Sequence, residues 1–319
     1  MNEREFVDSL RKRFEKPPGL VSDWMGDDCE VIDIGDPENY LLLTVDTSSE
    51  MVDFPQNAPP FEVGYFCAAL SLSDIAACGG NPTGVLVSCS VSREYIEEMQ
   101  QIYTGIEKAV NDAGTVILGG DTNSAGEFSL SVVSIGKVKK ENVLMRRRAG
   151  VDDVVAVTGY LDRFNYGYRQ YENNVSVGFR NMLRQPAPIE AGKVLAAVGG
   201  VTSCTDLPDG LVKTLYDNSP SGLGYLINDK DIPIQNKRSG VANFMLASRP
   251  AGDIQLLFTF ERSSLEAIER AFSERRLSLQ VIGVVTDSPG VRVNTPQGLL
   301  DVSVDIGFTH KFDDYKLFT

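Results

Sequence analysis

The sequence predicts a two-domain protein of the α+β or α/β class. Strand and helix patterns occur in both halves of the 319-residue chain, and this length suits one large domain or two medium ones. The densest basic stretch, Lys139-Lys140 with Arg146-Arg147-Arg148, lies between the halves, and a new strand starts at Val154. We therefore expect an N-terminal domain over residues 1–145 and a C-terminal domain over residues 146–319.

The first half alternates between the two types of element. Residues 4–15 are expected to form a helix that carries Phe6, Leu10 and Phe14 on one face and stops before Pro17. A largely apolar helix is predicted over 61–78, with Gly79-Gly80 as its C-cap. A further helix is expected from its N-cap Ser92 to Gly114, because apolar residues recur there at helical spacing. Strands are predicted at 41–45, 85–91, 115–118 and 129–138.

The second half shows a similar mixture. Strands are predicted at 154–157, 254–260 and 279–285, and a short helix is predicted over 211–216. A helix between the last two strands is marked by a capping box, Ser263 with Glu266 three residues later.

Composition excludes several classes of function. A net charge of −14 argues against a protein that binds a nucleic-acid backbone. The single histidine, His310, makes a His/Cys zinc site or a Ser-His-Asp hydrolase improbable. Five cysteines without a CxxC motif favour a reduced, cytoplasmic protein, and no apolar run is long enough to span a membrane.

The most informative feature is a set of aspartates at the ends of apolar runs, each beside Gly, Ser or Thr. Their segments are Gly26-Asp27-Asp28, Thr44-Val45-Asp46-Thr47, Ser71-Leu72-Ser73-Asp74, Gly119-Gly120-Asp121-Thr122 and Asp206-Leu207-Pro208-Asp209-Gly210. Carboxylates at such tips gather at the rim of a sheet, where ligands bind. An anionic cleft of this kind suits hard divalent cations that carry phosphate, which indicates Mg²⁺–nucleotide chemistry.

Each segment also has a structural alternative. Asp74 lies in the last turn of an apolar helix, where the helix dipole disfavours an anion, but it could be an exposed residue or a cap of the next turn. Gly119-Gly120-Asp121 could let a phosphate approach the backbone where a buried strand leaves the sheet, or could be an ordinary turn. Asp206 or Asp209 could cap the helix that starts at Leu211.

Arg146-Arg147-Arg148 is a concentrated run of positive charge, and it could clamp nucleotide phosphates or form a solvated linker. No Walker-type loop, protein-kinase glycine loop or GxGxxG motif is present in the sequence. Phosphate chemistry, if present, therefore needs another scaffold.

Taken in order, these segments resemble the ATP-binding superfamily of aminoimidazole ribonucleotide synthetase, and within it most closely the thiamine-monophosphate kinase family. The similarity also includes Ile75-Ala76-Ala77-Cys78-Gly79, Ile117-Leu118 before Gly119, Arg146 with Ala149, and Val157-Thr158-Gly159. It covers residues 26 to 211 and continues more weakly to the C-terminus. The ordered set is specific, although each segment alone is not.

The resemblance implies a two-domain α+β subunit whose N-terminal mixed sheet pairs with that of a second subunit in a dimeric barrel, with a C-terminal α/β sandwich. It implies a homodimer, ATP as co-substrate, several Mg²⁺ ions, and phosphoryl transfer to thiamine monophosphate. No catalytic side chain is expected beyond positioning and metal catalysis. The implied metal ligands are Asp28, Thr44, Asp46, Asp74, Asp121, Asp206 and Asp209. The implied ATP contacts are Tyr103, Gly120, Asp121 and Arg146, and the implied substrate contacts are Asp53 and Tyr315.

The chain departs from the family mainly on the acceptor side. Asp53 stands where the family has a histidine, Gly252 where it has a glutamate, Pro208 where it has a serine, and Val45 where it has a threonine. The Gly-Asp-Ser that follows Thr-Gly in the family is replaced near Asp162-Arg163-Phe164. The nucleotide and metal half of the site is therefore better kept than the acceptor half.

Two other readings stay open on the sequence. The first is an ATP-dependent synthetase of the same superfamily, although Asp46-Thr47-Ser48-Ser49 replaces the synthetase's Asp-Gly-Val-Gly-Thr-Lys. The second is a nucleotide-binding protein without turnover, which the altered acceptor half would suit.

Overall fold

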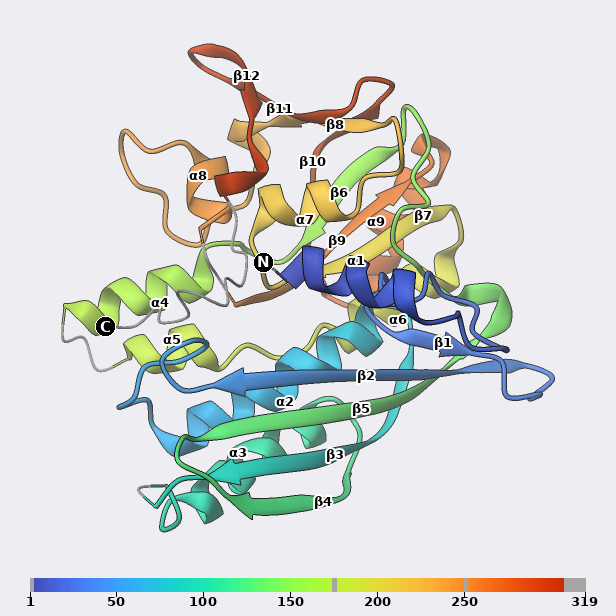
Figure 1. Cartoon of the computed structure of the whole chain (residues 1–319). Coiled ribbons are helices and arrows are strands. Elements are labelled where there is room, and N and C mark those ends of the chain that lie inside the picture. The colour runs from blue at the N-terminus through green and yellow to red at the C-terminus, as the bar shows by residue number, and fades with distance from the viewer. Residues whose placement is uncertain (1–2, 94, 174–176, 250–251, 307–319) are drawn as a thin grey trace.

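A computed structural model describes residues 3–93, 95–173, 177–249 and 252–306 of the chain. It contains two β-sheets with helices packed against them, and the five-stranded sheet lies below the seven-stranded sheet in Figure 1. Both sheets mix parallel and antiparallel pairs, so the predicted mixture of α and β structure is confirmed. The division at residues 145 and 146 stays a prediction; β5 ends at Lys139 and β6 begins at Val154.

The first half of the chain builds the smaller sheet, in the order β1-β2-β5-β3-β4. Its elements are α1 (Glu3–Arg13), β1 (Glu30–Ile32), β2 (Asn39–Ser49), α2 (Pro60–Ala77), β3 (Asn81–Val91), α3 (Met99–Asp112), β4 (Ile117–Ser124), β5 (Ser129–Lys139) and the 3₁₀ turn η1 (Lys140–Asn142).

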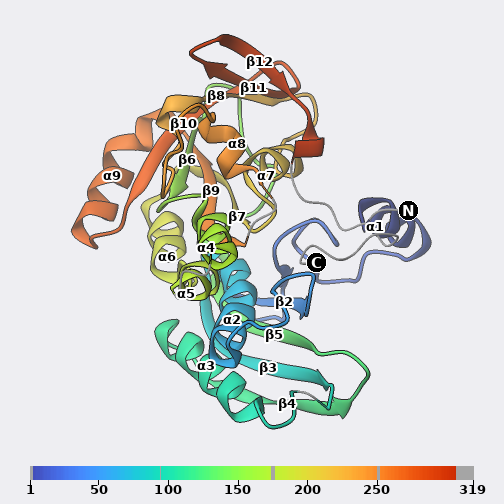
Figure 2. The same ribbon diagram turned by 90° about the vertical axis from the view of Figure 1, so that its left-hand side faces the viewer.

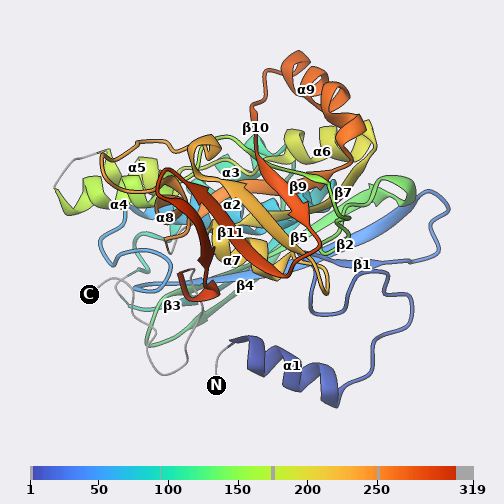
Figure 3. The same cartoon turned by 90° about the horizontal axis from the view of Figure 1, so that it is seen from above.

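The second half builds the larger sheet, in the order β12-β11-β8-β10-β6-β9-β7. Its strands are β6 (Val154–Thr158), β7 (Val201–Leu207), β8 (Gly224–Asn228), β9 (Asp253–Phe260), β10 (Leu279–Thr286), β11 (Gly290–Thr295) and β12 (Gly298–Val302). Its helices are α4 (Arg163–Glu172), α5 (Gly178–Leu183), α6 (Ile189–Val198), α7 (Leu211–Asp217), α8 (Asn243–Ala247) and α9 (Leu265–Glu274), with 3₁₀ turns η2 (Asp229–Asp231), η3 (Arg262–Ser264) and η4 (Val304–Ile306). Figure 3 shows α1 and α9 on opposite sides of the molecule.

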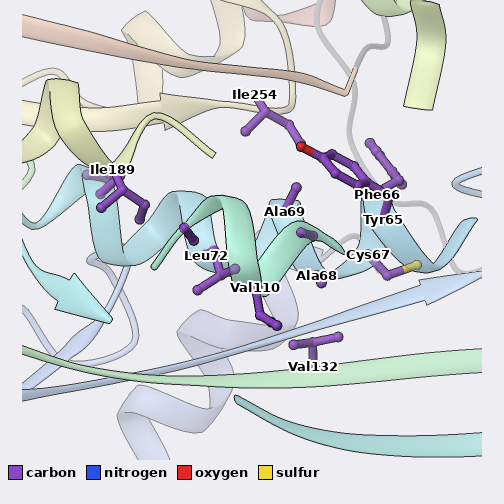
Figure 4. Close-up of a cluster of buried hydrophobic side chains, with 14 of the residues drawn as sticks. Tyr65, Phe66, Cys67, Ala68, Ala69, Leu72, Val110, Val132, Ile189 and Ile254 are labelled. Atoms are coloured by element: carbon purple, nitrogen blue, oxygen red, sulfur yellow. The ribbon is translucent and has the colours of Figure 1, made fainter. Parts of the chain in front are cut away.

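Helix α2 is the centre of the main hydrophobic core, and it is apolar on most of its circumference because elements of both halves pack on it. Figure 4 shows its side chains between Val132 of β5, Ile189 of α6 and Ile254 of β9. Two glycines allow neighbouring helices to approach closely. A Cβ on Gly64 would lie 1.9 Å from the Ile102 carbonyl oxygen of α3, and one on Gly192 of α6 would lie 2.1 Å from that of Ala76.

The smaller sheet has two different faces. One face carries Val132 and Val87, which are fully buried in the core with α2 and α3 (Figure 2). The opposite face, here called the outer face, carries the row Val45, Val133 and Leu86, which are paired across β2, β5 and β3. Val45 is 60% exposed and Leu86 is 38% exposed, so apolar side chains of the outer face meet solvent.

The start of α3 differs from the prediction. The helix begins at Met99 with Glu98 as its N-cap, and Ser92 instead accepts a hydrogen bond from the Tyr95 backbone in a preceding turn. Tyr95 is buried, stacks on Phe128 at a centroid distance of 4.4 Å and donates its hydroxyl proton to Glu50 over 2.6 Å. Because these tertiary contacts stabilise the turn, α3 begins later in the sequence than predicted.

The predicted capping box is also absent among the described residues. Ser263 lies inside the 3₁₀ turn η3, and Ser264 is the N-cap of α9 without a side-chain capping bond. Ser263, which the capping-box pattern predicted as the N-cap, is therefore part of the 3₁₀ turn.

Strand β4 is longer than expected and is exposed. The sequence predicted a buried strand that left the sheet at Gly119-Gly120, but these glycines lie inside β4, which pairs in parallel with β3 at the sheet edge. A Cβ on Gly120 would lie 1.9 Å from the Val87 carbonyl oxygen. The glycine is thus needed for strand pairing, which weakens its use as evidence for a phosphate loop.

Candidate active-site cavity

A cavity of about 1110 Å³ lies between the two halves of the chain. Strand β2 and helix α2 line it from the first half, and α4, α7 and the end of β7 line it from the second. The loop before β1 supplies Asp27 and Asp28, and the stretch after η1 supplies Arg146. The described cavity therefore collects side chains from most of the aspartate segments of the sequence.

Three of the predicted carboxylates meet in this cavity. Asp28 comes from the loop before β1, Asp74 from the last turn of α2, and Asp206 from the end of β7. One carboxylate oxygen from each lies within 4.8 Å of the others, which is close enough for one metal ion to contact all three. Thr44 of β2 joins the group, because its hydroxyl donates to Asp74 over 2.5 Å.

Asp46 lies on the same side of β2 as Thr44, since residues two apart in a strand share a face. One of its oxygens, Oδ2, is buried and has no hydrogen-bond partner among the described residues, and the same is true of Asp28 Oδ2. Buried acceptors without a partner are costly, so both oxygens are suited to a cation.

Burial dominates the electrostatics of the cluster. It raises the pKa of Asp27 and of Asp46 to about 6. It also raises the pKa of Asp74 and Asp206 well above the usual range, and the neighbouring carboxylates raise both pKa values further. Aspartates packed in this way repel one another unless protons or cations intervene.

Arg146 supplies positive charge inside the cluster. Its guanidinium pairs with Asp28, donates to the Thr205 hydroxyl over 2.8 Å and lies 3.9 Å from Asp206. Burial alone would lower the pKa of this guanidinium, but Asp28, Asp206 and Asp74 raise it, so the charge is retained. The alternative of a solvated linker therefore does not hold for Arg146.

Asp209 lines the cavity beside the start of α7 and pairs with Lys213 over 2.6 Å. The N-cap of α7 is Gly210, whose φ is +86°, so neither Asp206 nor Asp209 serves as the cap that the structural alternative required. Ser73 donates its hydroxyl proton to Asp206, which ties the end of β7 to α2.

Three predicted nucleotide contacts do not lie with the cluster. Asp121 and Gly120 are on the exposed edge strand β4, three strands from β2, or about 14 Å at the usual strand spacing. Asp121 also belongs to the row of Thr47 on the outer face, whereas Asp46 belongs to the row that faces α2. Tyr103 is on α3, packed against the main core.

On the acceptor side, Asp53 and Gly252 both line the cavity, and Tyr315 lies outside the described residues. One carboxylate oxygen of Asp53 accepts a hydrogen bond from the Ser49 backbone over 2.7 Å and so caps a turn. A Cβ on Gly252 would lie 2.8 Å from ring atoms of Phe66 and Phe164. Two aromatic rings therefore fill the space beside Gly252.

Sequence reasoning gave no role to Asp27, although its segment was singled out, and it missed Thr205, Lys213 and one face of α4. Asp27 accepts a hydrogen bond from the Arg146 backbone over 2.9 Å. The spacing of Phe164, Tyr168 and Glu172 at intervals of four was a readable signal for the α4 face.

Comparison with known proteins shows which proteins this chain resembles. Residues 26–138 match the family model described as AIR synthase related protein, N-terminal domain. Within the described residues, no helix has the length and apolar character needed to cross a membrane.

Curated relatives include several thiamine-monophosphate kinases. The chain is 26% identical to the thiamine-monophosphate kinase of Methanospirillum hungatei JF-1, over 83% of this chain and 88% of the relative. It is 27% identical to the thiamine-monophosphate kinase of Pyrococcus abyssi, over 97% of this chain and 96% of the relative. A solved structure of AaThiL complexed with AMPPCP and TMP has the same fold, with a TM-score of 0.83, 23% identity and 97% coverage of both chains. The resemblance read from the motifs is thereby confirmed.

Proposed function

We propose that this chain is an ATP-dependent kinase that phosphorylates the phosphate of thiamine monophosphate and so produces thiamine diphosphate. The observation that carries the proposal is the meeting of Asp28, Asp74 and Asp206 in a cavity of a chain that resembles thiamine-monophosphate kinases along most of its length. The fold agrees with that of AaThiL, whose complex holds an ATP analogue and TMP.

The cavity residues fit Mg²⁺. The donors are oxygens of carboxylates and of one hydroxyl, which are hard ligands, and Asp28 and Asp46 each keep a buried oxygen without a partner among the described residues. The residues that would hold the ions are Asp28, Thr44, Asp46, Asp74, Asp206 and Asp209. When bound, Mg²⁺ would neutralise the triphosphate and the charge that develops during phosphoryl transfer.

The remaining work falls to positioning by the chain itself. A phosphate acceptor is already ionised near neutral pH, so no side chain needs to remove a proton from it. Arg146 keeps a positive charge beside Asp28 and Asp206 and limits their mutual repulsion. Thr205 and Ser73 fix the orientations of Asp28 and Asp206 through their hydroxyls.

The proposal includes a homodimer through the smaller sheet. The outer face exposes apolar side chains of β2, β3 and β4, with Val45 at 60% and Leu118 at 54% exposure. Strand β4 is the edge strand of the sheet, paired with β3 on one side only. A second copy would cover this face, complete the dimeric barrel, and bring Gly120 and Asp121 of β4 to the partner's cavity. This arrangement would explain why Asp121, a predicted metal ligand, lies on β4, three strands away from β2 within one subunit.

Calorimetric titration of ATP with Mg²⁺ and with EDTA tests the nucleotide site, and a coupled assay with thiamine monophosphate tests the reaction. We expect ATP to bind well only with Mg²⁺, because the carboxylates repel bare triphosphate. Asp46→Asn should abolish turnover, and Asp301→Asn, an exposed aspartate outside the cavity, should leave it unchanged. Equal ATP affinity in both conditions, or absence of activity on thiamine monophosphate, would contradict the proposal.

A further inference from the structure

One face of α4 forms a continuous wall of the cavity. The residues on this face are Phe164, Asn165, Tyr168, Arg169 and Glu172. Their spacing of three and four residues means that one turn after another of the helix faces the same space. Phe164 stands in the stretch that replaces the family's Gly-Asp-Ser, and the other residues of this face belong to none of the motifs. The α4 wall is therefore a separate part of the site.

Helix α2 lines the cavity from the α4 wall to the carboxylates, so its length gives the distance between them. Phe66, Leu70 and Asp74 line the same cavity at intervals of four residues. At 1.5 Å per residue, the eight residues from Phe66 to Asp74 span about 12 Å. Phe66 contacts Phe164 of α4 with ring centroids 5.7 Å apart. The aromatic end of the cavity is therefore about 12 Å from the carboxylate end.

The surroundings of this end favour a flat ring over a phosphate. Phe164 and Phe66 close the cavity beside Gly252, where a Cβ would meet both rings at 2.8 Å. Tyr168 is partly buried, lines the cavity and contacts the Tyr171 ring with centroids 6.1 Å apart. Asn165 adds an amide whose nitrogen is buried and has no hydrogen-bond partner in the described part of the chain. Aromatic surface beside an amide suits a heteroaromatic ring with polar edges.

Arg169 does not turn this end into a second phosphate site. Its guanidinium is paired with the buried carboxylate of Asp162 through contacts of 2.6 and 3.2 Å. Asp162 itself is held at the start of α4, because its backbone nitrogen donates to Asp253 over 2.6 Å. The positive charge is thus committed to a contact that fixes α4 in place.

We propose that the α4 wall, through Tyr168 and Asn165, selects the acceptor by its distal heteroaromatic ring, the ring farther from the phosphate. The inference rests on the proposed function and adds a specificity determinant to it. In thiamine monophosphate the distal ring is the aminopyrimidine, because the phosphate is attached through the thiazolium side. An acceptor that lacks the distal ring should therefore bind no more tightly because of the α4 wall.

The test compares two tyrosines of the same helix. Tyr168→Leu removes a ring that lines the cavity. Tyr166→Leu is the matched control, because Tyr166 is not among the residues that line the cavity and its hydroxyl accepts a hydrogen bond from Gln170. Each variant is assayed with thiamine monophosphate and with the phosphate ester of hydroxyethylthiazole, which has no pyrimidine. Asn165→Ala is assayed in the same way, and thermal melting verifies that each variant is folded.

We expect Tyr168→Leu and Asn165→Ala to raise KM for thiamine monophosphate about tenfold, as loss of a stacking or hydrogen-bond contact implies. KM for ATP should stay within about twofold, and kcat/KM for the thiazole phosphate should not change. If wild type is active on thiamine monophosphate but Tyr168→Leu and Tyr166→Leu behave alike, the α4 inference is wrong and the kinase proposal stands. If wild type is inactive on thiamine monophosphate, both fail.

Discussion

The Thr44 hydroxyl donates a hydrogen bond of 2.5 Å to Asp74, which joins the middle of β2 to the last turn of α2 across thirty residues of sequence. Asp74 is the residue that local rules would not place there, because a helix C-terminus disfavours an anion. Burial and the carboxylates of Asp46, Asp206 and Asp28 add to this cost and raise the pKa of Asp74. An unfavourable placement of this kind is typical of functional sites.

Asp74→Asn should therefore reduce turnover by at least about a hundredfold while leaving the folded protein intact. The amide oxygen can still accept the Thr44 hydrogen bond, and removal of one repelling carboxylate should leave the apo melting temperature unchanged or raise it by a few degrees. Calorimetry in EDTA and a coupled kinase assay measure both effects. A variant that is active, or that loses its cooperative melting transition, would contradict this view of Asp74.

The sequence predicted the main elements and the carboxylate half of the site because both depend on local patterns. Periodicity located α2, β5 and β9, and the aspartates at the ends of apolar runs indicated Asp28, Asp74 and Asp206, which the fold brings together. The order of these segments along the chain carried the resemblance that the comparisons confirm.

The errors arose where tertiary contacts override local patterns. Tyr95 stacks on Phe128 and delays α3, and Gly120 serves strand pairing in β4. The α4 wall was missed because Phe66 and Gly252, which lie beside Phe164, are far from it in the sequence. Phe66, Phe164 and Gly252 lie between 88 and 186 positions apart, and a single sequence does not reveal such proximity.

The apo protein should be more stable at pH 5 than at pH 7.5. Burial raises the pKa of Asp27 and Asp46 to about 6 in the folded state, above the value of about 4 expected in the unfolded chain. The folded state therefore binds more protons between these values, and the free energy of unfolding falls as the pH rises through about 6.

Melting curves in EDTA at the two pH values check this expectation, and Asp46→Asn should show a smaller difference than wild type. Mg²⁺ should instead stabilise the protein more at pH 7.5, because metal binding requires ionised carboxylates. A melting temperature in EDTA that increases from pH 5 to pH 7.5 would show that other groups dominate.

Asp53→Asn should raise KM for thiamine monophosphate several-fold while KM for ATP changes little. The asparagine oxygen can replace the carboxylate oxygen that accepts the Ser49 hydrogen bond, so the turn is kept and only the negative charge is removed. Loss of that charge should weaken binding of a cationic acceptor. Asp53→Ala removes both, and the comparison separates charge from turn structure. Equal KM values for wild type and Asp53→Asn would exclude a role for this charge.

Two inactive variants should restore activity when their subunits are mixed. Asp46 lies in the cavity of one subunit, and Asp121 on the exposed β4 is proposed to reach the cavity of its partner. Co-expression of Asp46→Asn with Asp121→Asn in equal amounts should give mixed dimers as about half of the population. One site of each mixed dimer would then contain both wild-type aspartates, so about a quarter of the wild-type activity should return.

Each variant alone is the control and should be inactive but dimeric by light scattering. A third variant, Leu118→Asp, places a charge on the apolar outer face and should give folded, inactive monomers, because an unpaired charge in an interface is costly. If mixing restores no activity although mixed dimers form, then Asp121 does not act across the interface. If wild type is monomeric at micromolar concentration, the shared site itself is refuted, and the exposed apolar side chains of the outer face, Val45, Leu86 and Leu118, need another explanation.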